Sequence, residues 1–286
     1  MDELAALVSL FLGIRAKAGA VNRLFYSPED RFGKPIEYEG KNEPLLPITS
    51  GLPQIIRLGS IRNLTDIEIL RDLPRSEIGD VNALVKAARQ YQQAIWVADS
   101  DPNLAWLILV SAIEIVAERW SSEAKSPRER LETWNKGIFD LLLENLCDKT
   151  INKIAKALSN ITRSTSKFVE FICEFYSGEP ENRPREFARF SFNTENIRSA
   201  AKIVYSHRSN SLHNGVAFPR PMCEAPKILR FSEDDVDAVP PEKPTYRAAS
   251  SAGAVWKDTD TPMLLHTFEH ITRTAIISWW TRRRME

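Results

Sequence analysis

The chain has 286 residues, of which 43% are hydrophobic and 27% are charged. This composition is ordinary for a globular protein and excludes wholesale disorder. The 38 basic side chains equal the 38 acidic ones, so the chain as a whole lacks the positive charge that draws a protein to nucleic acid or to a membrane. Any contact with RNA or DNA must therefore come from a local patch.

The cysteines and the apolar runs indicate the cellular compartment. Cys147, Cys173 and Cys223 share no metal-ligand spacing with the four histidines, which is typical of free thiols in a reducing environment. We expect Cys147 and Cys173 to be core residues, because apolar helical sequence surrounds them. The first residues lack the basic region of a signal peptide, and the most apolar run, residues 104–117, is shorter than the roughly 20 residues that span a bilayer. These features predict a cytoplasmic protein that does not bind a membrane.

Residues 1–75 divide into a helix and an irregular extension. Apolar residues recur at helical spacing in the first turns and predict a helix from residue 1 to about residue 25. Beyond it, prolines and glycines interrupt short extended pieces such as PIEYEG and PQIIRLG. We interpret this part as loops, with room for a small pair of strands, in front of a helical domain that covers residues 76–286.

From Ser76 onward the sequence is strongly helical. Residues 76–99 carry apolar side chains at steps of three and four, and residues 101–120 follow with Asp101 placed as N-cap and Pro102 at the first helical position. This second helix is apolar almost all round, so we expect it at the centre of a bundle. Further helices are predicted over residues 127–145, 150–158, 164–176, 194–212 and 261–284.

A long loop is expected before the last helix. Residues 216–259 are rich in prolines and contain an acidic run, which predicts an excursion outside the core. Thr261, with Pro262 behind it, is the expected N-cap of the closing helix. The predicted fold class is therefore all-α: a helical bundle with an irregular N-terminal extension.

The stretch YSHRSNSLHNG, residues 205–215, places polar residues at the end of an apolar helix. Arg208 falls on the apolar stripe, and a buried guanidinium needs an anionic partner or a ligand because it cannot lose its proton. Asn214 and Gly215 predict the end of the helix beside His213. In one interpretation Arg208 pairs with a core carboxylate, and His213 favours the negative end of the helix dipole. In the other, both converge on a phosphate, which the guanidinium holds while the histidine moves a proton.

Glu114 is the only charged residue in the apolar run of residues 104–117. A buried carboxylate must be paired or protonated. We expect Glu114 to form a hydrogen-bonded pair with Arg208 that orients the guanidinium. The alternative is a pair with Lys86, Arg89 or a helix end elsewhere.

The pattern Arg-x4-His, written here as Arg208-Ser-Asn-Ser-Leu-His213, resembles the signature of the HEPN superfamily of helical nucleases. The continuation LHNG is similar to the HG that follows in the ApeA-like subgroup. The paired helices over residues 91–118, with a glutamate placed as Glu114 is, and the final helix with its two tryptophans also resemble this subgroup. The resemblance covers about residues 80–215 and the last helix, and leaves out the N-terminal extension and the long loop.

This resemblance implies a metal-independent endoribonuclease without a cofactor, in which the 2′-hydroxyl of RNA attacks the neighbouring phosphate and leaves a cyclic phosphate end. His213 would serve as general base or acid, and Arg208 would hold the scissile phosphate and stabilise its charge. Family members usually form homodimers whose motifs line one cleft, and a role in antiviral defence or as a toxin is implied. Because five residues turn an ideal helix by about 140°, both side chains can face one phosphate only across two protomers or after the last turn unwinds.

The neighbours of the motif bear on activity. Active family members often carry Asn, Asp or His directly after the arginine, where this chain has Ser209, which can still form a hydrogen bond. Tyr205 can stack on a base or close the core at the helix end, and His207 is expected to be an exposed neighbour. Ser209 and the balanced charge favour an alternative function, a non-catalytic HEPN module for dimerisation or interaction. A third alternative is a helical domain in which the motif is a coincidence.

Other candidate sites have less specific patterns. Arg183, Arg185 and Arg189 form a basic cluster that can contact an RNA backbone, although a solvated face is the simpler interpretation. His266 and His270 have the i, i+4 spacing of zinc ligands, but no third ligand is in view and we expect a surface pair. The sequence has no Walker A, GxGxxG, HExxH or GxSxG motif, so it gives no support to ATP, dinucleotide or zinc-protease chemistry.

Overall fold

The computed structural model describes residues 1–19, 23–35, 53–55, 62–120, 126–227, 239–245, 248–251 and 254–284. Within these residues the chain is mostly helical, which confirms the predicted all-α fold class with a small irregular N-terminal extension. None of the helices in the described part is long and apolar enough to cross a membrane.

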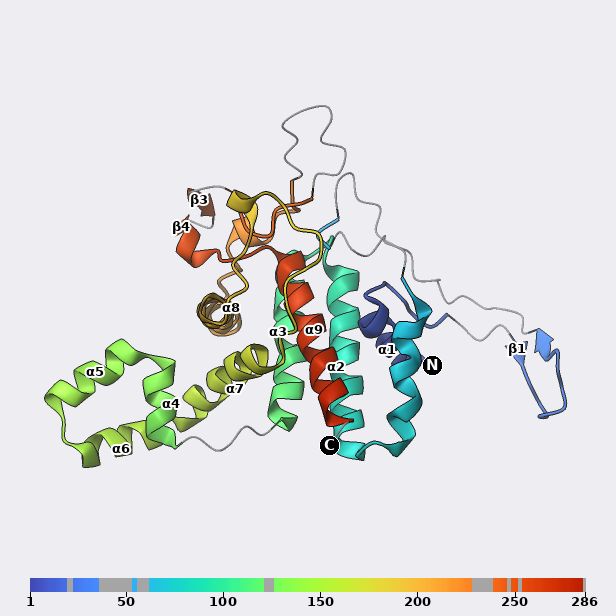
Figure 1. Ribbon diagram of the computed structural model, residues 1–286, viewed down its shortest axis with the longest axis horizontal. Coiled ribbons are helices and arrows are strands. Elements are labelled where there is room, and N and C mark those ends of the chain that lie inside the picture. Colours follow the sequence, from blue (N-terminus) through green and yellow to red (C-terminus); the bar gives the residue numbers. More distant parts are fainter. Residues whose placement is uncertain are drawn as a thin grey trace.

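The centre of the bundle consists of three long helices that run side by side in Figure 1: α2 (Ile78–Val97), α3 (Pro102–Arg119) and α9 (Leu265–Arg283). α3 begins as predicted, because the Asp101 side chain accepts a hydrogen bond from the backbone N–H of Leu104 at 2.9 Å. Trp106 of α3 is fully buried and stacks against Phe218 and Phe268, with ring centroids 5.2 and 4.8 Å apart. The apolar helix α3 therefore lies inside the core, as expected.

The N-terminal helix α1 (Asp2–Leu12) packs along α2 and shares its core. It ends well before the predicted limit, because Gly13 adopts a left-handed conformation with φ of 63°. Arg273 of α9 then donates to the carbonyls of Leu10 and Phe11, at 2.8 and 2.6 Å, which satisfies acceptors that a helix end leaves unpaired. The predicted domain boundary stays a prediction, although α1 and the later helices bury their apolar faces together.

Two further helices, α7 (Ser159–Phe175) and α8 (Thr194–Asn214), pack against each other and against α3. Figure 1 shows α8 end on, whereas α2, α3 and α9 lie in the plane, so α8 crosses the central helices steeply. A capping residue begins α8 and a glycine ends it. The Asn193 side chain accepts the backbone N–H of Asn196 at 2.8 Å, and Gly215, with φ of 66°, stops the helix.

A small lobe projects from the bundle at the lower left of Figure 1 and contains α4 (Pro127–Trp134), α5 (Lys136–Asn145) and α6 (Asp148–Ala157). Its separate core consists of Leu131, Phe139, Ile151 and Ala155. The single helix predicted over residues 127–145 is wrong, because Asn135 is extended and its side chain caps α5 by accepting the N–H of Ile138 at 3.0 Å. Cys147 is exposed at the start of α6, which corrects the expectation of a core thiol, and Cys173 is partly buried.

Part of the segment predicted to lie outside the core, residues 216–259, is buried. Phe218 and Met222 are 4% and 0% exposed, and the ring N–H of Trp106 donates to the Met222 carbonyl at 3.1 Å. The expectation of an excluded loop is therefore wrong for these residues, because their apolar side chains find partners in distant helices. Residues 228–238 lie outside the described part. A hairpin completes the segment, formed by antiparallel strands β3 (Ala248–Ser251) and β4 (Ala254–Lys257).

The closing helix begins at Leu265, later than predicted. Thr261 is buried and its hydroxyl donates to the carbonyl of Lys257 at 3.2 Å, so it does not serve as the N-cap. The N-terminal extension contains a small strand pair, β1 (Arg23–Leu24) and β2 (Lys34–Pro35). Most of the predicted extended pieces, residues 36–52 and 56–61, lie outside the described residues. The described 3₁₀ helices are Leu64–Arg75, Glu186–Ala188, Arg220–Met222 and Asp258–Asp260.

Glu242 joins several segments through one buried carboxylate, which is 3% exposed. Arg183 donates to both of its oxygens, from Nε at 2.9 Å and from Nη2 at 2.6 Å. The backbone N–H of Phe190 donates to the same carboxylate at 2.7 Å. The backbone carbonyl of Glu242 accepts the Thr267 hydroxyl at 2.7 Å and the N–H of Leu264 at 3.0 Å. Glu242 therefore ties the chain before α8 to the start of α9.

Glu242→Ala should destabilise the fold strongly, because it removes the buried carboxylate that accepts hydrogen bonds from Arg183 Nε and Nη2. We expect the free energy of unfolding to fall by about 3–5 kcal/mol, measured by urea denaturation. Glu181→Ala removes an exposed carboxylate from the same stretch as Arg183 and should change it by less than about 0.5 kcal/mol. Equal effects of the two substitutions would contradict the role assigned to Glu242.

Candidate functional site

Glu114, Arg208 and Tyr205 meet where α3 and α8 pack together. Arg208 Nη2 donates to Glu114 Oε2 at 2.8 Å, and the Tyr205 hydroxyl donates to Glu114 Oε1 at 3.0 Å. The predicted pair of Glu114 and Arg208 is therefore confirmed. The side chains of Arg208 and Glu114 are 21% and 25% exposed, so the pair lies at the edge of the core rather than deep inside it.

Arg208 has N–H donors that are not used in hydrogen bonds within the described part of the chain. A guanidinium has five N–H donors, and Glu114 is the one hydrogen-bond partner of Arg208 among the described residues. Its Nε is buried without a partner in the described part of the chain, and its Cζ lies 5.5 Å from the centroid of the Tyr205 ring. The carboxylate and the aromatic ring thus orient the guanidinium, while its exposed edge is available to an anionic ligand.

Tyr205 closes the core beneath Arg208. It is 8% exposed, and its ring packs against Phe168 with the centroids 5.1 Å apart. Burial, reinforced by the negative charge of Glu114, raises the pKa of Tyr205 to about 12. Tyr205 therefore stays a neutral donor that holds Glu114, which favours the core interpretation over stacking on a base.

His213 lies at the C-terminal end of α8 and is exposed. α8 remains helical as far as Asn214, so the last turn is not unwound between Arg208 and His213. The two side chains consequently leave the helix axis in directions about 140° apart. With α8 in this conformation, one chain alone therefore does not aim both side chains at a single phosphate.

The residues on either side of Arg208 differ in their surroundings. Ser209, the residue after Arg208 in α8, is partly exposed. His207, which we expected to be exposed, is partly buried, and its Nε2 lies 2.7 Å from the Asp260 carbonyl oxygen. The centroid of its ring lies 5.8 Å from the ring centroids of both Phe218 and Trp256. Burial lowers the pKa of His207. His207 therefore attaches α8 to the chain before α9 and belongs to the structural framework.

The basic cluster near residue 185 is not a uniform surface. Arg183 is committed to the buried carboxylate of Glu242, so it is not available to an RNA backbone. Arg185 and Arg189 are exposed, and Arg189 donates to the Pro184 carbonyl at 2.7 Å. The contact of this cluster with RNA stays a prediction for Arg185 and Arg189 alone.

The expectation of a surface histidine pair is wrong. His270 is 8% exposed, and its Nε2 lies 3.0 Å from the Gly178 carbonyl, whereas His266 Nε2 lies 2.8 Å from the Pro241 carbonyl. Glu269 between them is buried and accepts the Tyr91 hydroxyl at 2.6 Å; burial, followed by the charge of Glu269, raises the pKa of Tyr91. No group of three or more His, Cys, Asp or Glu side chains in the described residues could hold a metal ion.

Two surface hollows of ≈ 530 Å³ lie away from Arg208 and His213. One is lined by α2 and its neighbours, and it carries three cations, Lys17, Lys86 and Arg89, that the sequence did not bring together as a site. The signal was present: Lys86, Arg89 and Gln93 follow i, i+3 and i+7, which places them on one exposed face of α2.

The raised pKa of Tyr205 makes stability depend on pH in the alkaline range. An unfolded tyrosine ionises near pH 10, whereas Tyr205 in the folded protein stays protonated to about pH 12. Between these values the unfolded state binds fewer protons, so the free energy of unfolding falls as the pH rises. Tyr205→Phe should make this alkaline loss smaller, as measured by urea midpoints at about pH 9 and pH 11. Tyr26→Phe, at an exposed position, should leave the loss unchanged, and an unchanged loss in Tyr205→Phe would contradict the raised pKa.

Comparisons with known proteins give no family assignment. No family model, no curated protein and no solved structure matches the chain. The resemblance to the HEPN superfamily therefore rests on the motif and the helices that carry it in the sequence, and any function must be argued from the geometry of the site.

Proposed function

We propose that the protein is a metal-independent endoribonuclease of HEPN type. The observation that supports this proposal is the Glu114–Arg208 pair, which fixes a partly exposed guanidinium whose remaining donors can hold a phosphate. His213 lies exposed five residues further along the same helix and is of the residue type that exchanges a proton near neutral pH. These are the two kinds of group that RNA cleavage through the 2′-hydroxyl requires.

The proposed reaction is an internal displacement at phosphorus. His213 takes the proton of the 2′-hydroxyl, and the 2′ oxygen attacks the adjacent phosphorus. The bond from phosphorus to the 5′ oxygen breaks, and this oxygen receives the proton from the His213 imidazolium, which returns to its neutral form. The products are a 2′,3′-cyclic phosphate and a 5′-hydroxyl end. Arg208, held by Glu114, donates to the non-bridging oxygens as negative charge develops on them.

A homodimer is part of this proposal. Because Arg208 and His213 point about 140° apart on one intact helix, we place Arg208 of one protomer and His213 of its partner around the same phosphate. The two-fold axis of a dimer would then generate two equivalent sites in one cleft.

The resemblance supplies the proposed setting, which is RNA cleavage in antiviral defence or as a toxin in the cytoplasm. The competing function is a non-catalytic HEPN module that dimerises or binds a partner. Ser209 after the arginine and the balanced total charge favour that alternative. The partly exposed guanidinium, with donors to spare, favours catalysis.

Arg208→Ala and His213→Ala should each slow RNA cleavage by two orders of magnitude or more. Loss of the phosphate-binding donors costs about 10²–10³-fold in rate and loss of the proton-transfer group about 10²–10⁴-fold. The measurement is cleavage of a mixed pool of labelled RNAs in EDTA, with analysis of the 3′ ends for cyclic phosphate. Arg198→Ala, an arginine earlier on α8, is the matched control and should cut like the wild type. RNA cleavage near the wild-type rate in either site variant would exclude the proposed mechanism, and folded wild-type protein that cuts no RNA would favour the non-catalytic module.

Mixing the two inactive variants tests the shared cleft. A dimer of one Arg208→Ala chain and one His213→Ala chain has one complete site, built from the arginine of one protomer and the histidine of the other. After subunit exchange we expect roughly one quarter of the wild-type rate, since half of the dimers are mixed and each has one of two sites intact. Mixed dimers that stay inactive would show that the two residues act within one chain or not together.

A further inference from the structure

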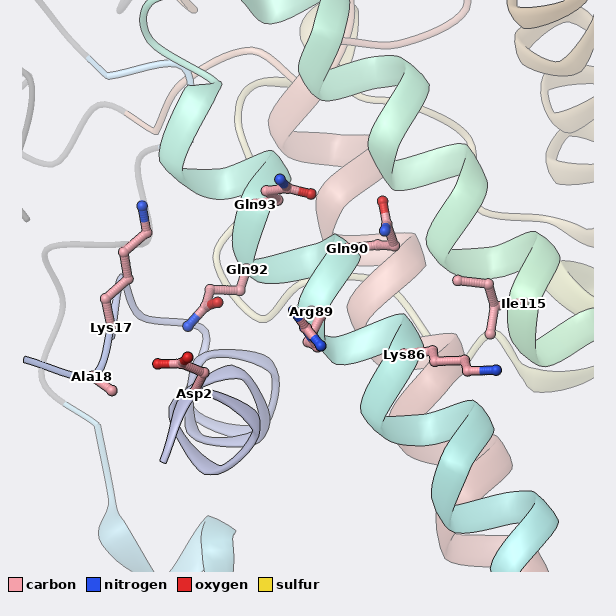
Figure 2. A pocket seen from close by; sticks show the side chains of 9 residues that line it. All are labelled: Asp2, Lys17, Ala18, Lys86, Arg89, Gln90, Gln92, Gln93 and Ile115. Carbon is pink, nitrogen blue, oxygen red and sulfur yellow. The ribbon is translucent and has the colours of Figure 1, made fainter.

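A hollow of ≈ 530 Å³ lies beside α2, between α1 and α3, and it belongs to no site described so far. Figure 2 shows Lys17, Gln92 and Asp2 at one end, Lys86 and Ile115 at the other, and Arg89 between them. Its lining therefore runs along the helix rather than around a point. From Lys86 to Gln93 the seven steps along α2 rise by roughly 10 Å.

The charge of this hollow is positive and is not neutralised locally. Lys17, Lys86 and Arg89 line it, and Asp2 is the one carboxylate among its lining residues. No ion pair of 4.0 Å or less joins Asp2 to any of these cations within the described residues, and Lys86 and Arg89 form none there with other carboxylates. Three cations around one carboxylate give a local surplus on a chain whose total charge is zero.

The end of the hollow that carries Lys17 is held in place by the fold. Gln92 donates to the Ala16 carbonyl at 2.5 Å, and the Ser9 hydroxyl donates to the same oxygen at 3.0 Å. The backbone N–H of Ala16 donates in return to Ser9 Oγ at 3.1 Å. The Lys17 ammonium then lies 4.3 Å from the centroid of the Trp96 ring. A cation fixed in this way loses less conformational freedom when it binds an anion.

We propose that this hollow binds a run of phosphate groups. Lysine and arginine are the side chains that hold phosphate oxygens, and here they are spaced along a groove, which suits several linked phosphates better than one. The amides of Gln90 and Gln93, also in the lining, add neutral hydrogen-bond donors. The phosphates can come from the backbone of single-stranded RNA or from a free polyphosphate chain, and the chemistry of recognition is the same.

The hollow does not include Arg208. It is lined in part by α3, the helix that also carries Glu114, the partner of Arg208. Ile115 of α3 reaches the hollow, whereas Glu114, the preceding residue, faces Arg208. Phosphate binding in the hollow requires neither Arg208 nor His213, so it does not depend on the proposed nuclease function.

The test is the binding of a short, fluorescein-labelled 2′-O-methyl RNA, which has no free 2′-hydroxyl and cannot be cut by the proposed reaction. We expect the double substitution Lys86→Ala and Arg89→Ala to weaken its binding about tenfold and to reduce the slope of log K against log salt by about 1.4, the value for two phosphate contacts on a single strand. Both positions are exposed on a helix, where alanine is well tolerated. Asp2→Asn, which removes the one carboxylate of the lining, should strengthen binding.

The matched control is Lys153→Ala with Lys156→Ala, two exposed lysines on α6 that remove the same charge elsewhere; it should bind as the wild type does. Arg198→Ala, on α8 and outside the lining of the hollow, should also retain binding. Inorganic tripolyphosphate distinguishes the sources. If the Lys86/Arg89 variant loses the heat of tripolyphosphate binding that the wild type shows, but binds the RNA as the wild type does, the hollow is a site for free polyphosphate. If neither ligand binds the wild type, or if the Lys86/Arg89 variant binds both as the wild type does, the inference is overturned.

Discussion

A carboxylate on the central, largely apolar helix α3 needs hydrogen-bond donors, and this need determines how α8 meets α3. One oxygen of Glu114 is taken by Arg208 and the other by Tyr205. A polar group at the edge of a core is costly to leave without a partner. α8 can therefore slide or rotate along α3 only by breaking both hydrogen bonds together. The position of the helix end that carries His213 follows from this constraint.

Much of the helical framework could be predicted because its signals are local. An N-cap such as Asp101 or a helix stop such as Gly215 depends on a few neighbouring residues and on backbone geometry. The pair of Glu114 and Arg208 could also be predicted, although the two residues are 94 positions apart. Each interrupts the apolar pattern of its own helix, and a charge that faces a core is costly unless an opposite charge pairs with it.

The burial of polar residues outside the long helices could not be predicted, since it depends on partners far away in the chain. Glu242 lies in a proline-rich stretch typical of a loop, and its partner Arg183 looked like part of a solvated basic cluster. His270 has the spacing of an exposed pair, yet other segments cover it. In the candidate site, the orientation of Arg208 followed from the sequence. His213 is exposed at the end of α8, and the apolar periodicity of a helix carries no information about what an exposed side chain contacts.

The lobe of α4, α5 and α6 has a small core of its own, Leu131, Phe139, Ile151 and Ala155, whereas the bundle buries a far larger apolar cluster. Stability grows with the apolar surface that is buried together. The lobe should therefore open at a lower free energy than the bundle unfolds, as a unit of its own. α7 packs against both α4 and the central helices, so such an opening would leave one side of α7 exposed and the other side in place. The molecule would then pass through a partly opened state in which the bundle, with α3 and α8 still joined, persists without its lobe.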